Sequence, residues 1–220
     1  MTILNLNQKP IKLSCSEKIN EPLMVCSHER SGTHFLMNSI ANCTYYTVNP
    51  FLNYDYIPLG SIINFFHEGS VNRFFNYIST LKNDQSSSNS STCVNSILKS
   101  HFPLPLLGNN YIGKCKIAYI YRHPAELFIS YWKFLHRWNW FEGPKLNSPL
   151  ELMKAKPSGQ SQRYQMQNYS NYFERWANHV ISANTACKNS PYIFCINYKN
   201  LKNEYKNTIK SLTKNLNIKI

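Results

Sequence analysis

The segment SHERSGTHF, residues 27–35, lies between two apolar runs, EPLMV at 21–25 and FLMNSIA at 35–41. The first run is typical of a buried strand and the second of the start of a helix. A tight turn at Gly32 would let the backbone bend sharply between them. Such a turn would expose unpaired N–H groups beside the positive end of the helix dipole, which together suit an anion.

Three side chains of this segment also fit an anion site. Ser31 and Thr33 offer hydroxyl donors, and Arg30 offers a fixed positive charge. The segment is not a Walker A loop, because the pattern G-x-x-x-x-G-K-[ST] is absent. Two interpretations stay open on this segment alone: a phosphate cradle, or an ordinary strand–helix turn that Ser or Thr caps.

Strand-like and helix-like segments alternate along the chain. Short apolar runs rich in β-branched and aromatic residues predict parallel strands buried on both faces, and amphipathic runs between them predict helices. The predicted strands are 23–28, 94–101, 116–122 and 192–198, and the predicted helices are 33–41, 124–138, 167–187 and the basic tail. We therefore expect an α/β fold, with one domain over residues 1–220 and a central parallel sheet flanked by helices.

Two stretches predict mobile surface loops. Residues 83–92, NDQSSSNSST, form a polar tract. Residues 139–160 carry three prolines and two glycines, so we expect a long irregular segment there. Loops of that length in a compact domain are often lids or binding loops.

The composition indicates the charge of the partners and the cellular compartment that we expect. Lys and Arg outnumber Asp and Glu by 24 to 11, and the formal charge of +13 favours anionic partners. The start lacks the apolar core of a signal peptide, and no run approaches the ~18 apolar residues of a membrane span. We expect a cytoplasmic chain without a transmembrane segment. Its seven cysteines should be reduced, mostly buried thiols, and the histidines and cysteines suggest no metal site.

A second motif, LKSHFPLPLL, places Lys99 and His101 at the end of a predicted strand. Residues on either side of Ser100 point to the same face of a strand. An imidazole can take a proton from a hydroxyl near neutral pH, and a neighbouring Lys can stabilise charge that develops on a transferred group. A purely structural histidine is the alternative.

The third motif, YIYRHPAELFIS, has Arg122 at the end of a strand and Ser130 within the following helix. An Arg at this edge faces the crevice where α/β folds bind ligands, and its planar fork suits a pair of phosphate oxygens. Alternatively, Arg122 caps the helix or pairs with Glu126.

Taken in order, these motifs resemble those of the cytosolic type of PAPS-dependent sulfotransferases, where PAPS is 3'-phosphoadenosine 5'-phosphosulfate. The family's Lys-Ser-Gly-Thr-Thr-Trp is similar to residues 30–35, and its Lys-Thr-His-x-Pro to residues 99–103. Its Arg with a Ser eight residues later matches Arg122 and Ser130. NYFERWANHV resembles the family's aromatic and Trp-x-x-His-Val helix, and YKNLK its Tyr-Glu-Asp-Leu/Met stretch. The resemblance runs from about Leu23 to Ile220.

The resemblance implies a P-loop-like nucleotide-binding topology and in-line transfer of the sulfuryl group from PAPS to a hydroxyl or amine, with PAP as product and no metal. His101 would be the general base, and Arg30 and Lys99 would stabilise the moving charge. The remaining donor contacts implied are Ser31, Gly32, Thr33 and His34 on the 5'-phosphate, Arg122 and Ser130 on the 3'-phosphate, and Phe35 and Tyr198 beside the adenine.

The sequence departs from the family pattern at several positions. Arg30 stands where the family has its catalytic Lys, His34 replaces a Thr, and Phe35 replaces a Trp. The family's late Arg-Lys-Gly segment, which also grips the 3'-phosphate, has no counterpart before Ile220. We expect weaker donor binding, or a substitute basic group such as a lysine of the tail.

The acceptor and the assembly stay open. Aromatic residues crowd 45–77 and 131–141 and suit a small apolar alcohol or phenol, although most of these rings could be ordinary core. A basic rim equally suits a saccharide or a lipid head group. We expect no nucleic-acid partner, and a homodimer is an open alternative. The rival functions are a basic nucleic-acid-binding module, a degenerate nucleotide-binding homologue and a kinase-like enzyme.

Overall fold

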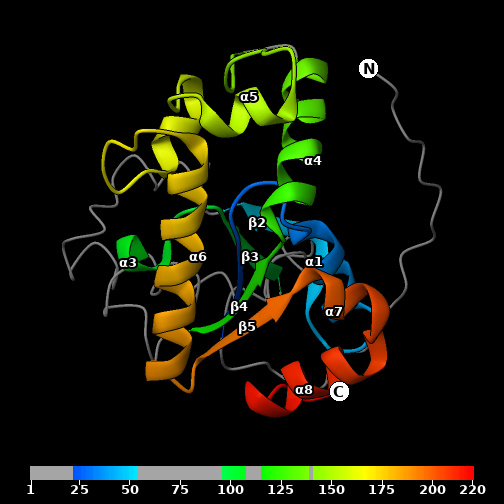
Figure 1. The fold of residues 1–220 in the computed structure, drawn as a ribbon. Coiled ribbons are helices and arrows are strands. Elements are labelled where there is room, and N and C mark those ends of the chain that lie inside the picture. Colours follow the sequence, from blue (N-terminus) through cyan, green and yellow to red (C-terminus); the bar gives the residue numbers. More distant parts are fainter. Residues whose placement is uncertain (1–21, 54–95, 108–114, 139–140) are drawn as a thin grey trace, which may run out of the picture.

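A five-stranded sheet forms the centre of the fold in the computed structural model, which describes residues 22–53, 96–107, 115–138 and 141–220 (Figure 1). All neighbouring strands are parallel, in the order β2-β3-β1-β4-β5. The bounds are β1 Leu23–Cys26, β2 Thr47–Asn53, β3 Ser96–Ser100, β4 Lys116–Tyr121 and β5 Ile193–Asn197. The predicted α/β fold with a parallel sheet is confirmed, and the expected loop at 83–92 lies outside the described residues.

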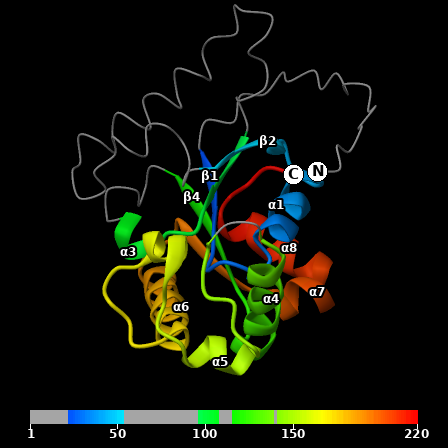
Figure 2. The same ribbon diagram turned by 90° about the horizontal axis from the view of Figure 1, so that it is seen from above.

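Helices cover both faces of this sheet (Figure 2). One face carries α1 (Thr33–Ala41), α7 (Tyr198–Asn203) and α8 (Tyr205–Asn215), and the other carries α3 (Leu104–Leu107) and α6 (Tyr172–Asn189). Beyond one end of the strands stand α4 (Pro124–Arg137) and α5 (Pro149–Lys154), and a 3₁₀ helix, η3, spans Gly159–Tyr164.

Alternating side chains of the strands divide the core into two layers. In β1, Leu23 and Val25 pack with residues of α1 and α8, whereas Met24 and Cys26 pack with residues of α3 and α6. All four of these side chains are fully buried. Burial on both faces explains why this strand is an unbroken apolar run in the sequence.

The segment 139–160 is more regular than we expected. Ser148 caps α5 by accepting a hydrogen bond from the N–H of Glu151, and Pro149 occupies the first turn. Leu152 is fully buried against the cluster that α4, α5 and α6 share. The prediction of an irregular loop was therefore wrong for Pro149–Lys154, because Pro149 begins this short helix instead of interrupting it.

Strand β2 was not predicted. It lies at the edge of the sheet and pairs with β3, with a register shift between Thr47 and Leu52. Pro50 within it has no N–H to donate, which an edge position tolerates better than a central one. Its proline and its mixed pattern concealed the strand.

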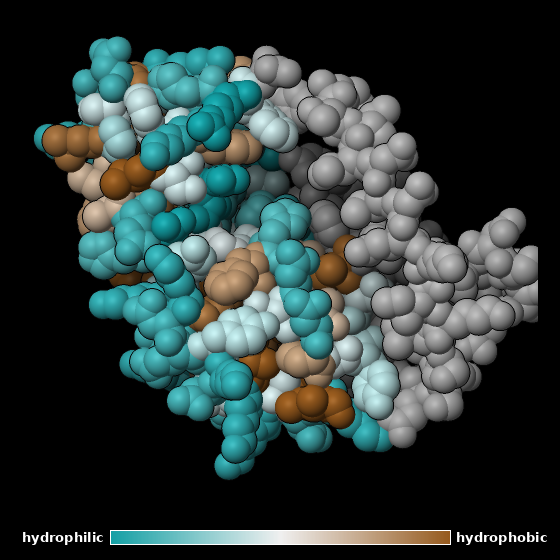
Figure 3. All heavy atoms as spheres, turned by 90° about the vertical axis from the view of Figure 1, so that its right-hand side faces the viewer, coloured by the Kyte–Doolittle hydropathy of each residue, from teal (hydrophilic) through white to brown (hydrophobic). Residues whose placement is uncertain are grey.

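The face that carries α1, α7 and α8 is largely hydrophilic, with small hydrophobic patches (Figure 3). The lysines of α7 and α8 are exposed, as expected of a solvated helical face: Lys199, Lys202, Lys206, Lys210 and Lys214. The five cysteines among the described residues are free thiols, two buried and three partly buried. No helix in the described ranges is long and apolar enough to cross a membrane.

Candidate active site

A cavity of about 560 Å³ opens where the carboxyl ends of β1, β3 and β4 meet. Parallel strands bring the loops that follow them to the same edge of a sheet, which is where α/β folds bind ligands. Every residue that we expected at the site lines this cavity except Ser31, which is fully buried in the loop beside it. The lining residues are Glu29, Arg30, Gly32, Thr33, His34, Phe35, Lys99, His101, Arg122, Ser130, Tyr131, Phe134, Trp138, Glu142, Arg163, Tyr164 and Tyr198.

The loop after β1 needs glycine at position 32 for two reasons. Its φ angle is 102°, in the left-handed region that favours glycine. A Cβ atom at this position would also lie 2.5 Å from Cδ2 of the Tyr198 ring. The first intrahelical hydrogen bond of α1 runs from the N–H of Leu36 to the carbonyl of Gly32, so the N–H groups before Leu36 belong to the first turn of the helix.

The two hydroxyl groups of the loop have different surroundings. Within the described part of the chain, the buried Ser31 hydroxyl has no hydrogen-bond partner. The Thr33 hydroxyl lies 2.7 Å from that of Ser27. A buried polar group without a partner is costly, so the orphaned Ser31 hydroxyl fits a ligand that bonds to it. Thr33 is better placed to contribute its backbone N–H.

Two guanidinium groups share one side of the cavity. Arg30 Nε donates to the hydroxyl of Ser130 at 3.3 Å, and its guanidinium lies over the ring of Phe134 at 4.9 Å. Arg122 lies over the ring of Tyr198 at 4.4 Å. Burial, followed by the charge of Arg122, lowers the pKa of Arg30. Two positive charges on the lining of one cavity favour an anion there.

The alternative partner of Arg122 is also present. The Nε of Arg122 donates to Glu126 Oε2 at 3.0 Å, which is the i,i+4 pair that the sequence allowed. Both groups of this pair are solvent-accessible, and exposed pairs contribute little, so Arg122 can still bind a phosphate.

His101 is oriented by a backbone carbonyl. Its Nδ1–H donates to the carbonyl of Ser27 at 2.9 Å, which makes Nε2 the ring atom that can accept a proton. Burial, followed by the charge of the buried Lys99, lowers the pKa of His101 to about 3. The imidazole is therefore neutral at physiological pH, as a general base must be. The ring edge of Tyr164 lies against it, with centroids 5.6 Å apart.

Aromatic rings form one wall near the start of α1. Phe35 lies against Tyr198 at a centroid distance of 6.1 Å and is stacked with Tyr205 at 6.3 Å. Tyr205 is a ring that the sequence motifs did not single out. Flat rings at a partly open position suit a purine base.

An ion pair that lines the cavity was missed by the sequence analysis. Arg163 Nη2 donates to Glu142 Oε1 at 2.8 Å, and the same guanidinium lies over the ring of Tyr164 at 4.4 Å. Glu142 is 6% exposed. Both residues fall in or next to the segment interpreted as an irregular loop, where no periodic pattern marks a buried side chain.

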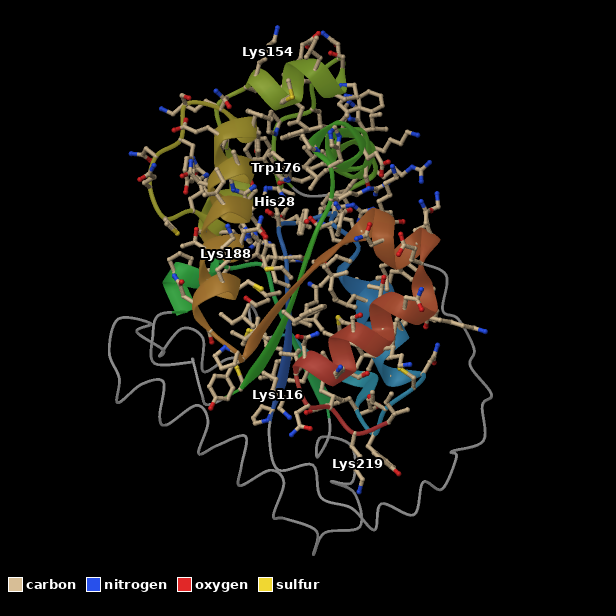
Figure 4. All side chains as sticks on the ribbon, turned by 60° about the horizontal axis from the view of Figure 1, so that its bottom comes forward. His28, Lys116, Lys154, Trp176, Lys188 and Lys219 are labelled. Atoms are coloured by element: carbon tan, nitrogen blue, oxygen red, sulfur yellow. The ribbon has the colours of Figure 1, made fainter. Side chains whose placement is uncertain are left out.

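A second buried ion pair was also missed. Arg175 of α6 donates from Nη2 to both carboxylate oxygens of Glu29, at 2.7 and 2.9 Å. Arg175 Nη1–H donates to Nε2 of His28 at 3.3 Å, and Figure 4 shows His28 beside α6, near Trp176. In the same view Lys116 lies at the far end of the sheet. The only sequence signal was the likeness of NYFERWANHV to a family helix, which gave Arg175 no role.

Metal ligands are not assembled in the part of the chain that the structure describes. No group of three or more His, Cys, Asp or Glu side chains there could hold a metal ion.

The sulfotransferase-domain model matches residues 20–220, so the chain belongs to the sulfotransferase domain family. It is 30% identical over 129 residues to cytosolic sulfotransferase 17 of Arabidopsis thaliana, a match covering 54% of this chain and 32% of that protein. It is 29% identical over 123 residues to cytosolic sulfotransferase 16 of the same plant, a match covering 52% of this chain and 31% of that protein. The matched regions thus span about a third of these relatives.

Solved structures show the same fold. Mouse sulfotransferase SULT7A1 complexed with PAP has a TM-score of 0.55 and 22% identity, over 91% of this chain and 60% of that chain. A retinol dehydratase in complex with androsterone and inactive cofactor PAP has a TM-score of 0.53 and 18% identity, over 90% of this chain and 60% of that chain. The sulfotransferase domain from the curacin biosynthetic pathway has a TM-score of 0.51 and 13% identity, over 93% of this chain and 76% of that chain.

Proposed function

We propose that this chain moves a sulfuryl group from PAPS to a hydroxyl or amine of an acceptor. One observation carries the proposal: the loop around Gly32, the distant Arg122 and the imidazole of His101 line a single cavity. Membership of the sulfotransferase domain family supports the interpretation of this cavity as a PAPS site, and two of the similar structures contain PAP.

The residues present fit a doubly phosphorylated adenosine. The N–H groups from Gly32 to His34 and the orphaned Ser31 hydroxyl would hold the 5'-phosphate. Arg122 and Ser130 would hold the 3'-phosphate, and Phe35 and Tyr198 would flank the adenine. When bound, the donor supplies the activated sulfuryl group.

His101 is the base in this proposal. Its Nδ1–H is committed to the Ser27 carbonyl, so Nε2 takes the acceptor proton. Lys99 lines the cavity two residues before His101. Lys99 and Arg30 stabilise the negative charge that shifts onto the oxygens around sulfur.

Arg30 performs its role differently from the family's Lys. An Arg fork spreads its charge over a plane, whereas a Lys ammonium is a compact point charge. Here the fork is fixed by Ser130 and by the ring of Phe134. A fixed guanidinium favours contact with two oxygens at once over contact with a single bridging oxygen.

The acceptor side combines aromatic rings with polar groups. Tyr131, Phe134, Trp138 and Tyr164 line the cavity together with the Glu142–Arg163 pair. This mixture suits a small ring-bearing alcohol or phenol, a saccharide or a lipid head group. The names of the plant relatives support a cytoplasmic setting.

The test is sulfuryl transfer from PAPS to a panel of phenols and alcohols, followed for the wild type and for His101→Ala. The wild type should form sulfated product, and His101→Ala should form none while binding PAP with nearly unchanged affinity. His136→Ala is a matched control, because His136 is an exposed histidine on α4 that does not line the cavity. Activity that survives in His101→Ala would overturn the assignment.

A further inference from the structure

Glu29 is a buried carboxylate at the edge of the cavity. It lies in the loop between β1 and α1, is 7% exposed, and lines the cavity together with His101. Burial alone would raise the pKa of this carboxyl, but the charge and hydrogen bonds of Arg175 hold its pKa well below its usual range. Glu29 is therefore ionised at neutral pH, and Arg175 fixes its position.

Helix α6 ties this loop to the backbone of His101. Arg175 and His179 are four residues apart and lie on one face of the helix. Arg175 holds Glu29, whereas His179 Nε2–H donates to the carbonyl of His101 at 3.1 Å. Because a carbonyl can only accept, Nε2 carries the proton of His179, and Nδ1 lies 2.7 Å from the Tyr119 hydroxyl, which also donates to the carbonyl of His179 at 3.2 Å. The same helix thus sets the carboxylate and the imidazole relative to each other.

Other groups around His101 are cationic or neutral. On its own strand Lys99 is a cation that opposes protonation of the ring. Burial lowers the pKa of His28 to about 3 and that of His179 to about 4, so both imidazoles are neutral. The ring of Tyr164 faces the imidazole from η3. Among these described neighbours, Glu29 supplies the negative charge.

We propose that Glu29 is a positioning residue that acts through His101, because its anchored carboxylate stabilises the imidazolium that forms during transfer. This inference rests on the proposed function. In the step concerned, the acceptor O–H bond breaks and its proton goes to Nε2 of His101. The oxygen's electron pair forms the new O–S bond, while the S–O bond to the 5'-phosphate breaks and its pair leaves with PAP.

The effect should depend on the acceptor. An acidic phenol gives up its proton readily and needs little from the base, whereas a weakly acidic phenol needs a strong one. The stabilisation that Glu29 provides should therefore matter most for acceptors of high pKa. A role limited to holding the fold would instead lower the rate equally for all acceptors.

The experiment uses the double variant Glu29→Gln/Arg175→Met. Glu29→Gln alone would leave Arg175 buried without a counter-ion, which destabilises proteins strongly, whereas removing both charges at similar volume is tolerated. We would measure kcat for transfer from PAPS to phenols ranging from nitro-substituted to alkyl-substituted, with pKa up to ~10. We expect a loss of roughly tenfold with the least acidic phenol, a smaller loss with the most acidic, and an unchanged KM for PAPS.

Two controls separate the interpretations. Arg175→Lys keeps a cation beside Glu29, so its dependence on phenol pKa should match that of the wild type. Glu174→Gln neutralises a carboxylate on the same helix that does not line the cavity and should change nothing. A loss in the double variant that is equal for all phenols would overturn the inference alone. A wild type that transfers sulfuryl to no phenol, alcohol or amine would overturn the proposed function and this inference with it.

Discussion

Replacing Gly32 by Ala is the sharpest test of the loop that we propose as the anion site. Gly32 has a φ angle of 102°, and an added Cβ would lie 2.5 and 2.8 Å from two carbons of the Tyr198 ring. Carbon atoms in contact are normally about 3.5 Å apart or more. Either the ring or the loop must move, and both line the cavity.

The magnitude has two parts. A left-handed backbone costs a residue with a Cβ atom about 1–2 kcal/mol, and forcing extra volume into a packed position costs about 1–3 kcal/mol. We therefore expect Gly32→Ala to lower the free energy of unfolding by about 2–5 kcal/mol. Displacing Tyr198 should also weaken binding of PAP, because Arg122 lies over the same ring.

The assay is urea denaturation at pH 7, with calorimetric titration of PAP on the same samples. Gly32→Ala in a Tyr198→Ala background provides the matched control: the overlap is gone and the backbone strain remains, so the penalty should fall to about 1–2 kcal/mol. An unchanged free energy of unfolding in the single variant, or an equal penalty in both backgrounds, would refute the reasoning.

Three further results are expected. Arg122→Ala should raise the Kd for PAP at least about tenfold by calorimetry, since a charge-assisted bond to a phosphate is lost; an unchanged Kd would contradict this role. Ser31→Ala should weaken PAP binding without lowering the melting temperature, because its buried hydroxyl has no partner among the described residues; a loss of stability would contradict that. Burial lowers the pKa values of His28, His101 and His179, so the unfolded chain binds protons first as pH falls below about 6.5. Stability in urea should therefore drop below pH 6.5 by about 1.4 kcal/mol per pH unit for each extra proton bound, and a flat profile from pH 7 to 5 would contradict it.

The sequence was sufficient to place the residues that follow the buried strands. Lys99, Arg122 and the loop at Gly32 each come directly after or at the end of a continuous apolar run. Because all the strands are parallel, their carboxyl ends meet at one edge, and residues far apart in sequence line one cavity. The prediction of parallel strands and the order of the motifs were therefore sufficient to predict that these residues line one cavity.

The buried ion pairs could not be predicted in the same way. Glu29 and Arg175 are separated by 146 residues, and a charged residue on a helix normally indicates a solvated face. Arg163 and Glu142 lie in segments without a hydrophobic period. Their burial depends on how α4, α5 and α6 pack over the end of the sheet, which local patterns do not encode. The edge strand β2 was missed for the related reason that one of its faces lacks a clear apolar pattern.

The central claim concerns recognition of the 3'-phosphate at a site shared with the loop at Gly32. Calorimetric titration of the wild type with PAP and with 5'-AMP tests it most directly, because the two nucleotides differ by that phosphate. PAP should bind at least about tenfold more tightly than 5'-AMP, and Arg122→Ala should remove most of the difference. Equal affinities for the two nucleotides, or no binding of PAP, would contradict the account.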